Sequence, residues 1–173
     1  LRGIIVFILT MYSSIETKNF NPHFVMLSNK TKNNIMDNSD FYRIYYSDQL
    51  HNSNGIFLFF VLKDINISKY FNKLKCSFKK EKNLDIIKSF TMIERNILDL
   101  CPESKHGRSR PIYRIGEQLD NCFIKIFAES PTVSYGKTPE YNFLLKISGI
   151  WSNEKKHGLT FRFYVVNHQL RSV

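Results

Sequence analysis

The sequence predicts a mixed, β-rich (α+β) domain that contains one main helix. Two patterns support this fold class: several short segments alternate between apolar and polar residues, and one longer segment repeats its apolar residues at helical spacing. The chain has 173 residues, of which 43% are hydrophobic and 14% aromatic. This length and composition suffice for one domain with a buried core.

Six segments have the composition of strands. Two of them, 41–46 (FYRIYY) and 56–62 (IFLFFVL), are separated by a turn signal around Asn52-Ser53-Asn54-Gly55. This signal predicts an antiparallel hairpin, with a connection longer than the tight two-residue type. A shorter strand is expected at 75–80. The last three strands are expected after the helix, at 122–128, 143–151 and 159–166.

The main helix is expected at about 83–101. Asn83 is a suitable N-cap residue, and Asp85 in the first turn suits the positive end of the helix dipole. One apolar stripe follows at alternating steps of four and three residues, formed by Ile86, Phe90, Ile93, Ile97 and Leu100. Glu94 lies off this stripe and is expected to be solvated, and Pro102 ends the helix.

The pattern divides the chain into three parts. Residues 1–10 (LRGIIVFILT) are apolar but too short to span a bilayer, and we interpret them as translated upstream sequence before a natural start at Met11. A β-strand packed on the core is the structural alternative. Residues 11–40 are expected to form a polar N-terminal extension, with a loop at 28–40. Residues 41–173 are expected to form a single domain.

The charge is strongly basic. The chain carries 25 Lys and Arg against 15 Asp and Glu, a net charge of +10. Such an excess attracts polyanions, nucleic acid or an anionic membrane face. An AT-rich gene offers a second explanation, because it enriches Lys, Asn and Ile whatever the protein does. No segment approaches transmembrane length, so we expect no membrane partner.

Cysteine usage and motifs favour a non-enzymatic, intracellular protein. Cys76, Cys101 and Cys122 form no CxxC pair, which is typical of a reducing compartment. The sequence lacks a P-loop, GxSxG, HExxH and GxGxxG, and its histidines are dispersed. We therefore expect no catalysis, no cofactor and no metal.

The last three strands have one apolar face and one mixed face, because successive side chains of a strand point to opposite sides. The mixed faces carry cations and aromatic rings, namely Phe123, Lys125, Phe127, Lys146, Arg162 and Tyr164. If the strands are neighbours, these residues line one surface. Cations that follow phosphates and rings that stack with exposed bases are typical of single-strand binding. The alternative is an ordinary half-exposed sheet, which shows the same alternation.

Two further features belong to this region. Trp151 shares the parity of Leu145 and Ile147, which favours a core position, and Gly149 is expected to mark a bulge or a sharp bend. The Pro-bounded segment 102–111 is expected to be a basic loop. Its cations and one beyond it predict a mobile arm that contacts phosphates, formed by Lys105, Arg108, Arg110 and Arg114.

The order of elements resembles that of the OB-fold, a barrel with a helix between its third and fourth strands. In addition, FLLKISGIWSNEKKHGLTFRF (143–163) is similar to a hairpin of OB-type single-stranded DNA-binding proteins of large DNA viruses and related mobile elements. The marks of this hairpin are Gly149-Ile150-Trp151, a polar turn, and Gly158-Leu159. The resemblance implies an OB-like, five- to six-stranded antiparallel barrel with 83–101 in the helix position.

The resemblance also implies a function. The protein would bind single-stranded DNA with little sequence preference, in viral DNA replication or recombination, and DNA is favoured over RNA as its partner. It would act in the host nucleus or cytoplasm, and self-association into a homo-oligomer stays open. The alternative is a structural or host-interaction protein of a DNA virus with a β-sandwich fold.

Overall fold

The computed structural model describes residues 14–49, 52–105, 107, 109–127 and 135–166. The expectations for residues 1–10 lie outside these ranges. The elements follow in the order β1 (Ile15–Glu16), η1 (Thr17–Asn19), η2 (Pro22–Phe24), β2 (Val25–Leu27), β3 (Thr31–Lys32), β4 (Asp40–Ser47), β5 (Asn52–Asn54), β6 (Ile56–Tyr70), β7 (Lys73–Phe78), η3 (Lys80–Lys82), α2 (Leu84–Leu98), α3 (Pro102–Lys105), β8 (Arg110–Ile112), α4 (Arg114–Asp120), β9 (Phe123–Phe127), β10 (Gly136–Ser152) and β11 (Lys156–Val166).

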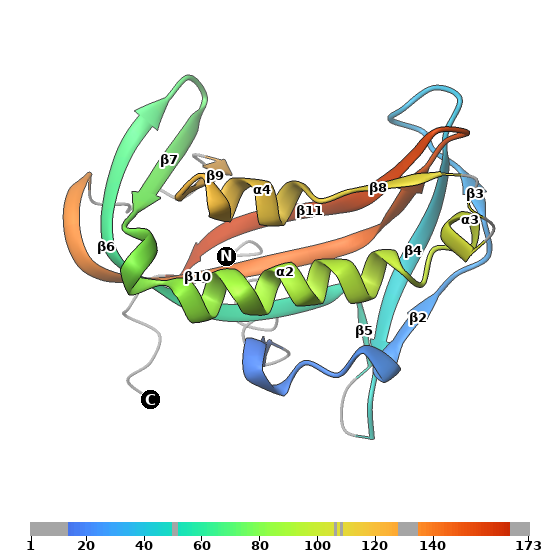
Figure 1. Cartoon of the computed structure of the whole chain (residues 1–173), viewed down its shortest axis with the longest axis horizontal. Helices are drawn as coiled ribbons and strands as arrows, with labels where there is room; N and C mark the ends of the chain where they lie inside the picture. Colours follow the sequence, from blue (N-terminus) through green and yellow to red (C-terminus); the bar gives the residue numbers. More distant parts are fainter. Residues whose placement is uncertain (1–13, 50–51, 106, 108, 128–134, 167–173) are drawn as a thin grey trace, which may run out of the picture.

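Five strands pair in a ring. β6 pairs with β7, β7 with β9, β9 with β11, β11 with β10, and β10 returns to β6. The weakest junction is between β9 and β11, where Phe163 opposite Ile126 is the one register pair among the described residues. β4 extends the sheet beyond the ring by pairing with β10, and β2, β3 and β5 pair with β4. Figure 1 shows the long strands β6, β10 and β11 curving around α2 and α4.

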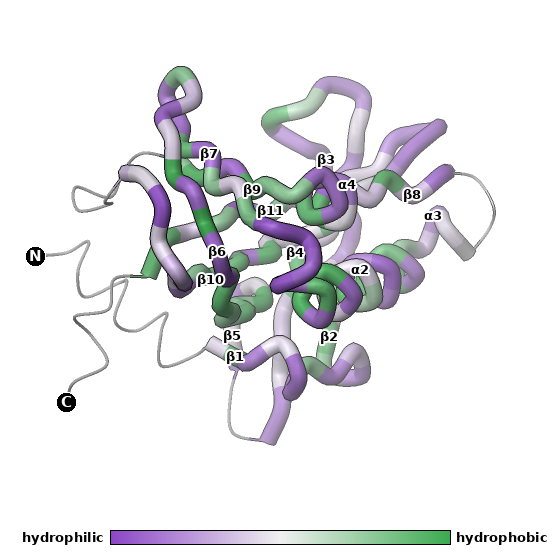
Figure 2. The backbone as a smooth tube through the Cα atoms, turned by 60° about the vertical axis from the view of Figure 1, so that its left-hand side comes forward, coloured by the Kyte–Doolittle hydropathy of each residue, from purple (hydrophilic) through white to green (hydrophobic). Residues whose placement is uncertain are grey.

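The core lies between the inner faces of these strands and α2. Phe60 of β6 occupies its centre, with ring centroids 4.8 Å from Phe90 of α2, 5.6 Å from Phe143 and 6.0 Å from Phe163. All four side chains are at most 2% exposed. Hydrophobic and hydrophilic residues alternate along α2 and along the strands (Figure 2), as expected for elements with one buried face.

The mixed, β-rich class is confirmed, and each of the six predicted strand segments lies on or overlaps a strand. The expected number of strands is too low, because the sheet has eleven strands within the described residues. The sheet is also mixed, whereas the prediction was an antiparallel barrel: β1 runs parallel to β6, and both β8 and β9 run parallel to β11. Short strands of two or three residues are too brief to show a period in the sequence.

The predicted hairpin between 41–46 and 56–62 does not form. β4 pairs instead with β5, and β6 pairs with β10 and β7. The turn signal itself is real, since Gly55 has φ +100° at the corner between β5 and β6. An added Cβ there would lie 2.9 Å from the backbone oxygen of Ile147. The turn is therefore present, but the strand that follows it, β6, pairs with strands other than β4. The residues of a turn do not determine that choice of partner.

The N-terminal part belongs to the domain rather than extending from it. β1 pairs with β6, while β2 and β3 pair with β4. Val25 is 9% exposed, and Phe20 and Phe24 pack against the core. The predicted loop at 28–40 therefore contains one short strand, β3, before the turn that leads into β4.

The helix is confirmed, but its buried face is wider than the predicted stripe. Ile87, Leu98 and Glu94 are buried together with the predicted Phe90, Ile93 and Ile97. The expectation that Glu94 is solvated is wrong. Its carboxylate accepts hydrogen bonds from the backbone N–H groups of Ile115 (2.9 Å) and Gly116 (2.7 Å). Glu94 therefore satisfies the first turn of α4, a role that comes from a partner far along the chain.

Candidate nucleic-acid interface

The structure brings the six strand residues predicted as a binding surface onto one face. Lys125 of β9 lies opposite Lys75 of β7, and Lys146 of β10 lies opposite Arg162 of β11. The pairing of Phe163 with Ile126 sets β9 beside β11. The buried Ile126 and Phe163 lie on the inner side, as predicted. The outer side therefore holds Phe123, Lys125, Phe127, Lys146, Arg162 and Tyr164.

Local structure fixes the position of β9. Cys122 lies two residues after the end of α4, and its φ of +58° turns the chain sharply into the strand. The backbone N–H of Lys125 donates a hydrogen bond to Oε1 of Gln118 on α4 at 3.2 Å. α4 is in turn held on α2 through Glu94. The strand that carries two aromatic rings and a lysine is thereby anchored to the core.

Cations and aromatic rings touch one another across this face. Lys73 Nζ lies 4.4 Å from the ring centroid of Phe127, and Arg162 Cζ lies 4.6 Å from the same centroid. Three more lysines place Nζ near a ring centroid: Lys75 lies 5.0 Å from Phe123, Lys125 lies 4.7 Å from Tyr70 and 5.5 Å from Phe123, and Lys146 lies 5.3 Å from Phe57. We call this set of residues the basic–aromatic face: Phe57, Tyr70, Lys73, Lys75, Phe123, Lys125, Phe127, Lys146 and Arg162.

The cations of the basic–aromatic face keep their charge available. Within the described part of the chain, none of its five Lys and Arg side chains forms an ion pair with a carboxylate. The contacts with rings hold the cations in position without neutralising them. Some cations elsewhere are paired: Lys79 pairs with Asp64 at 3.0 Å, and Lys80 pairs with Asp120 at 3.0 Å. The positive charge of the basic–aromatic face is therefore not offset by ion pairs among the described residues.

The accessible part of this side ends near Tyr164. Leu144, which lies opposite Tyr164, is 1% exposed, and Val166 is also 1% exposed. Tyr164 itself is half-buried. Of the predicted rings, Phe123 and Phe127 thus lie among the cations, and Tyr164 lies at the border of the covered area.

Four members of the face were missed by sequence analysis. Lys73 and Lys75 lie on β7, which was expected as a short strand but whose parity was not used. Phe57 lies in an almost continuous apolar run, where alternation is invisible. Tyr70 lies beyond Asp64, whose backbone has a φ of +54°. The buried residues of β6 change there from even positions such as Leu62 to odd positions such as Ile65, so parity counted from Ile56 fails for Tyr70.

A bulge in β10 overturns the prediction for Trp151. The register of β10 against β11 shifts between Ile147 and Gly149, which confirms the bulge expected there. Beyond it, Gly149 lies opposite Thr160, and Trp151 lies opposite Gly158. Trp151 is therefore half-buried on the outer side instead of being in the core. Parity assumed an unbroken strand, and one extra residue inverts it.

The cations expected on a basic arm do not join the basic–aromatic face as far as they are described. Arg110 starts β8 and lies opposite Lys156, at the far end of β11 from Arg162. Arg114 starts α4 and forms an ion pair with Glu117 at 2.7 Å. The backbone of Lys105 lies in α3, and Arg108 lies outside the described residues. The predicted loop thus contains a short helix and a short strand, and its role in phosphate binding stays a prediction.

A polar cluster near α3 resembles catalytic machinery only in its residue types. The Tyr42 hydroxyl donates to Oε1 of Glu103 at 2.6 Å, and the Cys101 thiol donates to Oε2 at 3.3 Å. Burial raises the pKa of Cys101 to about 11. A nucleophilic cysteine needs a lowered pKa. Ser109 Oγ lies 2.7 Å from Nδ1 of His157, but both residues are buried, with exposures of 8% and 0%.

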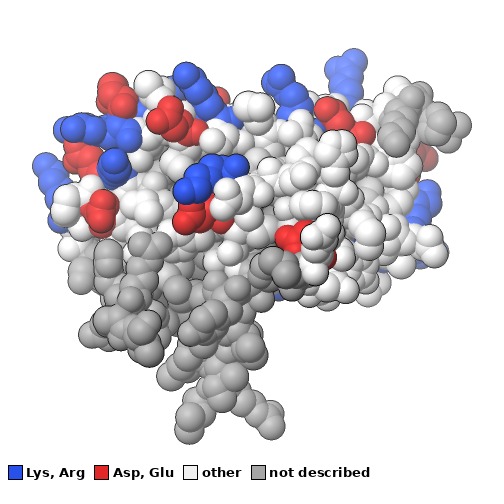
Figure 3. Space-filling view, turned by 90° about the horizontal axis from the view of Figure 1, so that it is seen from below, with Lys and Arg blue, Asp and Glu red and all other residues white. Residues whose placement is uncertain are grey.

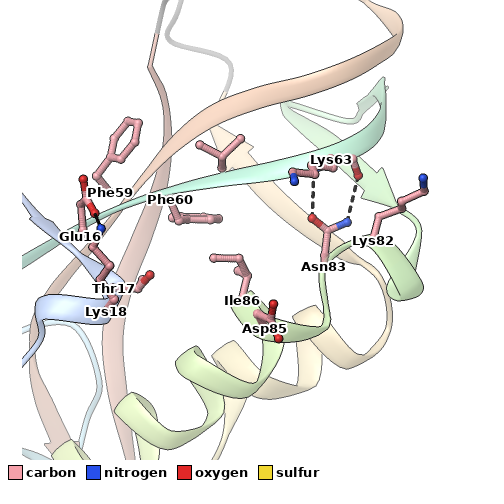
Figure 4. Close-up of a pocket in the computed structure, with 11 residues that line it drawn as sticks. Glu16, Thr17, Lys18, Phe59, Phe60, Lys63, Lys82, Asn83, Asp85 and Ile86 are labelled. Atoms are coloured by element: carbon pink, nitrogen blue, oxygen red, sulfur yellow. Dashed lines mark hydrogen bonds and ion pairs between the residues drawn. The ribbon is translucent and has the colours of Figure 1, made fainter.

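A hollow of about 420 Å³ between η1, β6 and the first turn of α2 has mixed charge (Figure 4). Lys18 in its wall is paired with Glu16 at 2.7 Å, and Asp85 lies opposite. Asn83, the expected N-cap, is at the predicted position, but its amide exchanges hydrogen bonds with the backbone of Lys63 at 2.8 and 2.9 Å. The polar atoms of Asn83 are used internally, and the charged residues that line the hollow carry both signs.

Positive and negative side chains are also mixed on the face of the molecule seen from below (Figure 3). On that side, Lys and Arg lie beside Asp and Glu, without an area of uniform positive charge. Among the described residues, no three His, Cys, Asp or Glu side chains converge as a metal ion requires. No helix in the same ranges is long and apolar enough to cross a membrane. Cys76, Cys101 and Cys122 are free thiols.

The sequence matches no protein family, and neither curated proteins nor solved structures show a significant similarity to it.

Proposed function

We propose that this protein binds single-stranded nucleic acid, DNA in preference to RNA, through the basic–aromatic face. The observation that carries the proposal is the interleaving of five cations with aromatic rings on one side of β6, β7, β9, β10 and β11, where none of the five forms an ion pair with a described residue. An ordinary half-exposed sheet places charges on its outer side, but it usually mixes both signs there. Here the described cations of the face have no carboxylate partner.

The chemistry of binding follows from this arrangement. The cations neutralise phosphates and release counterions, which makes affinity fall with salt concentration. Phe123 and Phe127 offer rings to unstacked bases, and every base has a π-face, so the interaction tolerates any sequence. The rings already hold the cations in place, which lowers the entropy lost on binding. No catalytic step is involved.

We also propose that the ring of strands is an OB-like barrel. Its strands in chain order are β6, β7, β9, β10 and β11, and the ring is weakest at the β9–β11 junction. OB-folds bind oligonucleotides on the face of their second and third strands and with the loop between the first two. In this chain those strands are β7 and β9, and the loop contains Phe71, which is 82% exposed. One difference is that α2 lies between the second and third strands of the ring.

A salt titration with matched charge variants tests the proposal. Fluorescence anisotropy of a labelled oligo-deoxythymidine is measured for the parent, for Lys75→Gln/Lys125→Gln, and for the control Lys82→Gln/Lys88→Gln, whose residues lie away from the face in η3 and α2. Both double variants lose the same net charge. The first should bind more weakly and lose about 1.4 from the slope of log K against log salt, at about 0.7 per contact. The control should keep the parental slope.

Equal slopes in the two double variants would mean that charge acts without a defined surface, which contradicts the proposal. No binding by the parent at low salt would favour the alternative of a structural or host-interaction protein. The same assay with RNA and duplex oligonucleotides tests the preference for DNA and for single strands. A role in viral replication or recombination stays a prediction from the resemblance.

A further inference from the structure

A pocket lies on the outer side of the sheet, beyond the basic–aromatic face. It is a cavity of about 420 Å³ between the 31–36 segment and strands β4, β10 and β11. This volume falls within the roughly 300–1,000 Å³ of small-molecule sites. Its lining combines two aromatic rings, two cations, small polar groups and two apolar side chains: Phe41, Trp151, Lys32, Arg43, Thr31, Asn33, Asn34, Ser148, Thr160, Ile35 and Met36.

Two glycines lay the aromatic rings against the sheet. The Phe41 ring occupies the space that a Cβ on Gly149 would need. Likewise, a Cβ on Gly158 would lie 2.8 Å from Cζ2 of Trp151. Each ring therefore covers bare backbone on one side, and both rings remain half-exposed and border the cavity. These are the glycines of the Gly149-Ile150-Trp151 and Gly158-Leu159 motif, and their role is to seat the two rings.

The charge of the pocket suits a phosphate. Lys32 is exposed, and Arg43 Nη1 has only a long hydrogen bond of 3.5 Å to Asn54 Oδ1 among its described interactions. Among the described residues that line the pocket, none is Asp or Glu. Ile35, at the same site, is 95% exposed. An apolar side chain left in water beside two rings and two cations indicates a ligand that is partly flat and apolar and partly anionic.

The pocket continues the basic–aromatic face. Thr160 in its wall lies two residues before Arg162 on the same side of β11, about 7 Å along the strand. Ser148, at the bulge, lies two residues after Lys146 on β10. A strand that follows Lys73, Phe127 and Arg162 would reach the pocket next.

We propose that this pocket holds one nucleotide of the bound single strand, with the base against Trp151 and Phe41 and the phosphate near Arg43 and Lys32. This inference rests on the proposed function and assigns it a second site. The hydroxyl group of Thr160 and the amide of Asn34 can form hydrogen bonds with base edges, whereas the Thr31 hydroxyl donates to the backbone oxygen of Phe41 at 3.0 Å. The pocket therefore adds a base preference at one position to a strand that is otherwise bound without regard to sequence.

Trp151 is the only tryptophan of the chain, so its fluorescence reports on the pocket alone. The full chain is titrated at low salt with labelled oligo-deoxythymidine and with an abasic sugar-phosphate chain of equal length and charge. Anisotropy reports binding, while Trp151 emission and its quenching by acrylamide report the pocket. We expect oligo-deoxythymidine to quench Trp151 and to protect it from acrylamide, and the saturating abasic chain to do neither.

Variants separate the pocket from the face. Arg43→Gln should reduce the protection of Trp151 and lower affinity several-fold, while Lys88→Gln, with the same charge loss, should change neither. Binding by anisotropy with unchanged Trp151 emission would overturn the pocket and leave the proposed function standing. Equal effects of the thymidine and abasic chains would show that no base enters. Absence of binding in the anisotropy channel would overturn both proposals.

Discussion

Removal of the Phe127 ring is the sharpest test of the basic–aromatic face, because this ring contacts two cations from two neighbouring strands. Lys73 Nζ lies 4.4 Å and Arg162 Cζ 4.6 Å from its centroid. If the ring stacks with a base, Phe127→Ala should weaken single-strand binding by about 1–3 kcal/mol, or about 5- to 150-fold in Kd.

The cost in stability can be worked from the same contacts. Each cation–π pair at an exposed site contributes about 0.5–1 kcal/mol, so the loss of two lowers the free energy of unfolding by about 1–2 kcal/mol. Ile126→Ala, at the adjacent and 2% exposed position, should lose about 2–5 kcal/mol because it leaves a cavity in the core. Its affinity per folded molecule should stay unchanged.

The assay combines thermal melting with anisotropy well below the melting temperature. Phe127→Leu serves as a control that keeps most of the apolar volume but removes the aromatic ring, and it should bind as weakly as Phe127→Ala. The reasoning is refuted if Phe127→Ala binds with parental affinity per folded molecule, or if Ile126→Ala loses as much affinity as Phe127→Ala. Either result would place the ligand on a different surface.

Two further predictions concern the fold that supports the site. Burial lowers the pKa of His157 below its ordinary value of about 6.5. Protonation of His157 therefore favours the unfolded chain, and the free energy of unfolding should decrease as the pH falls below about 6.5. Melting curves between about pH 7 and 5 should show this loss, and His157→Gln should flatten it; a parental slope in the variant would show that another group is responsible. Gly149→Ala should cost about 1–3 kcal/mol of unfolding free energy, because the new Cβ meets the Phe41 ring and the Tyr42 backbone. Chemical denaturation measures this free energy. Ser148→Ala, at the half-exposed bulge, is the control and should stay near parental stability. A Gly149→Ala protein of parental stability would contradict the close packing of the Phe41 ring on Gly149.

Much of the candidate site was accessible from local periodicity. Alternation in 122–128 and 159–166 correctly assigned Ile126 and Phe163 to the core and Phe127 and Arg162 to the outer side. Alternation holds where a strand is regular, because a strand side chain can point to only two sides. It failed at Trp151, where the bulge at 147–149 inserts an extra residue. Gly149 signalled this bulge, but the sequence did not reveal which side the following residues would take.

Pairing between distant segments was the other limit. The Asn54-Gly55 turn was recognised, yet the partner of β6 is β10, some 80 residues away in the chain. Glu94 was assigned to solvent because its own helix offers no partner, and its actual partners are backbone groups of α4. The position of Lys75 beside Lys125 likewise depends on β7 meeting β9 across the intervening helices.

The sequence by itself determined the β-rich class, the six strand segments, the main helix and the excess of positive charge. These properties arise from interactions between residues close in the chain or from composition alone. Only the tertiary structure decided that the strands close into a ring, that the cations of β7, β9, β10 and β11 meet aromatic rings on one face, and that Trp151 borders a pocket on that side. The physical reason is that strand pairing and register are set by the burial of the whole core, to which every segment contributes at once.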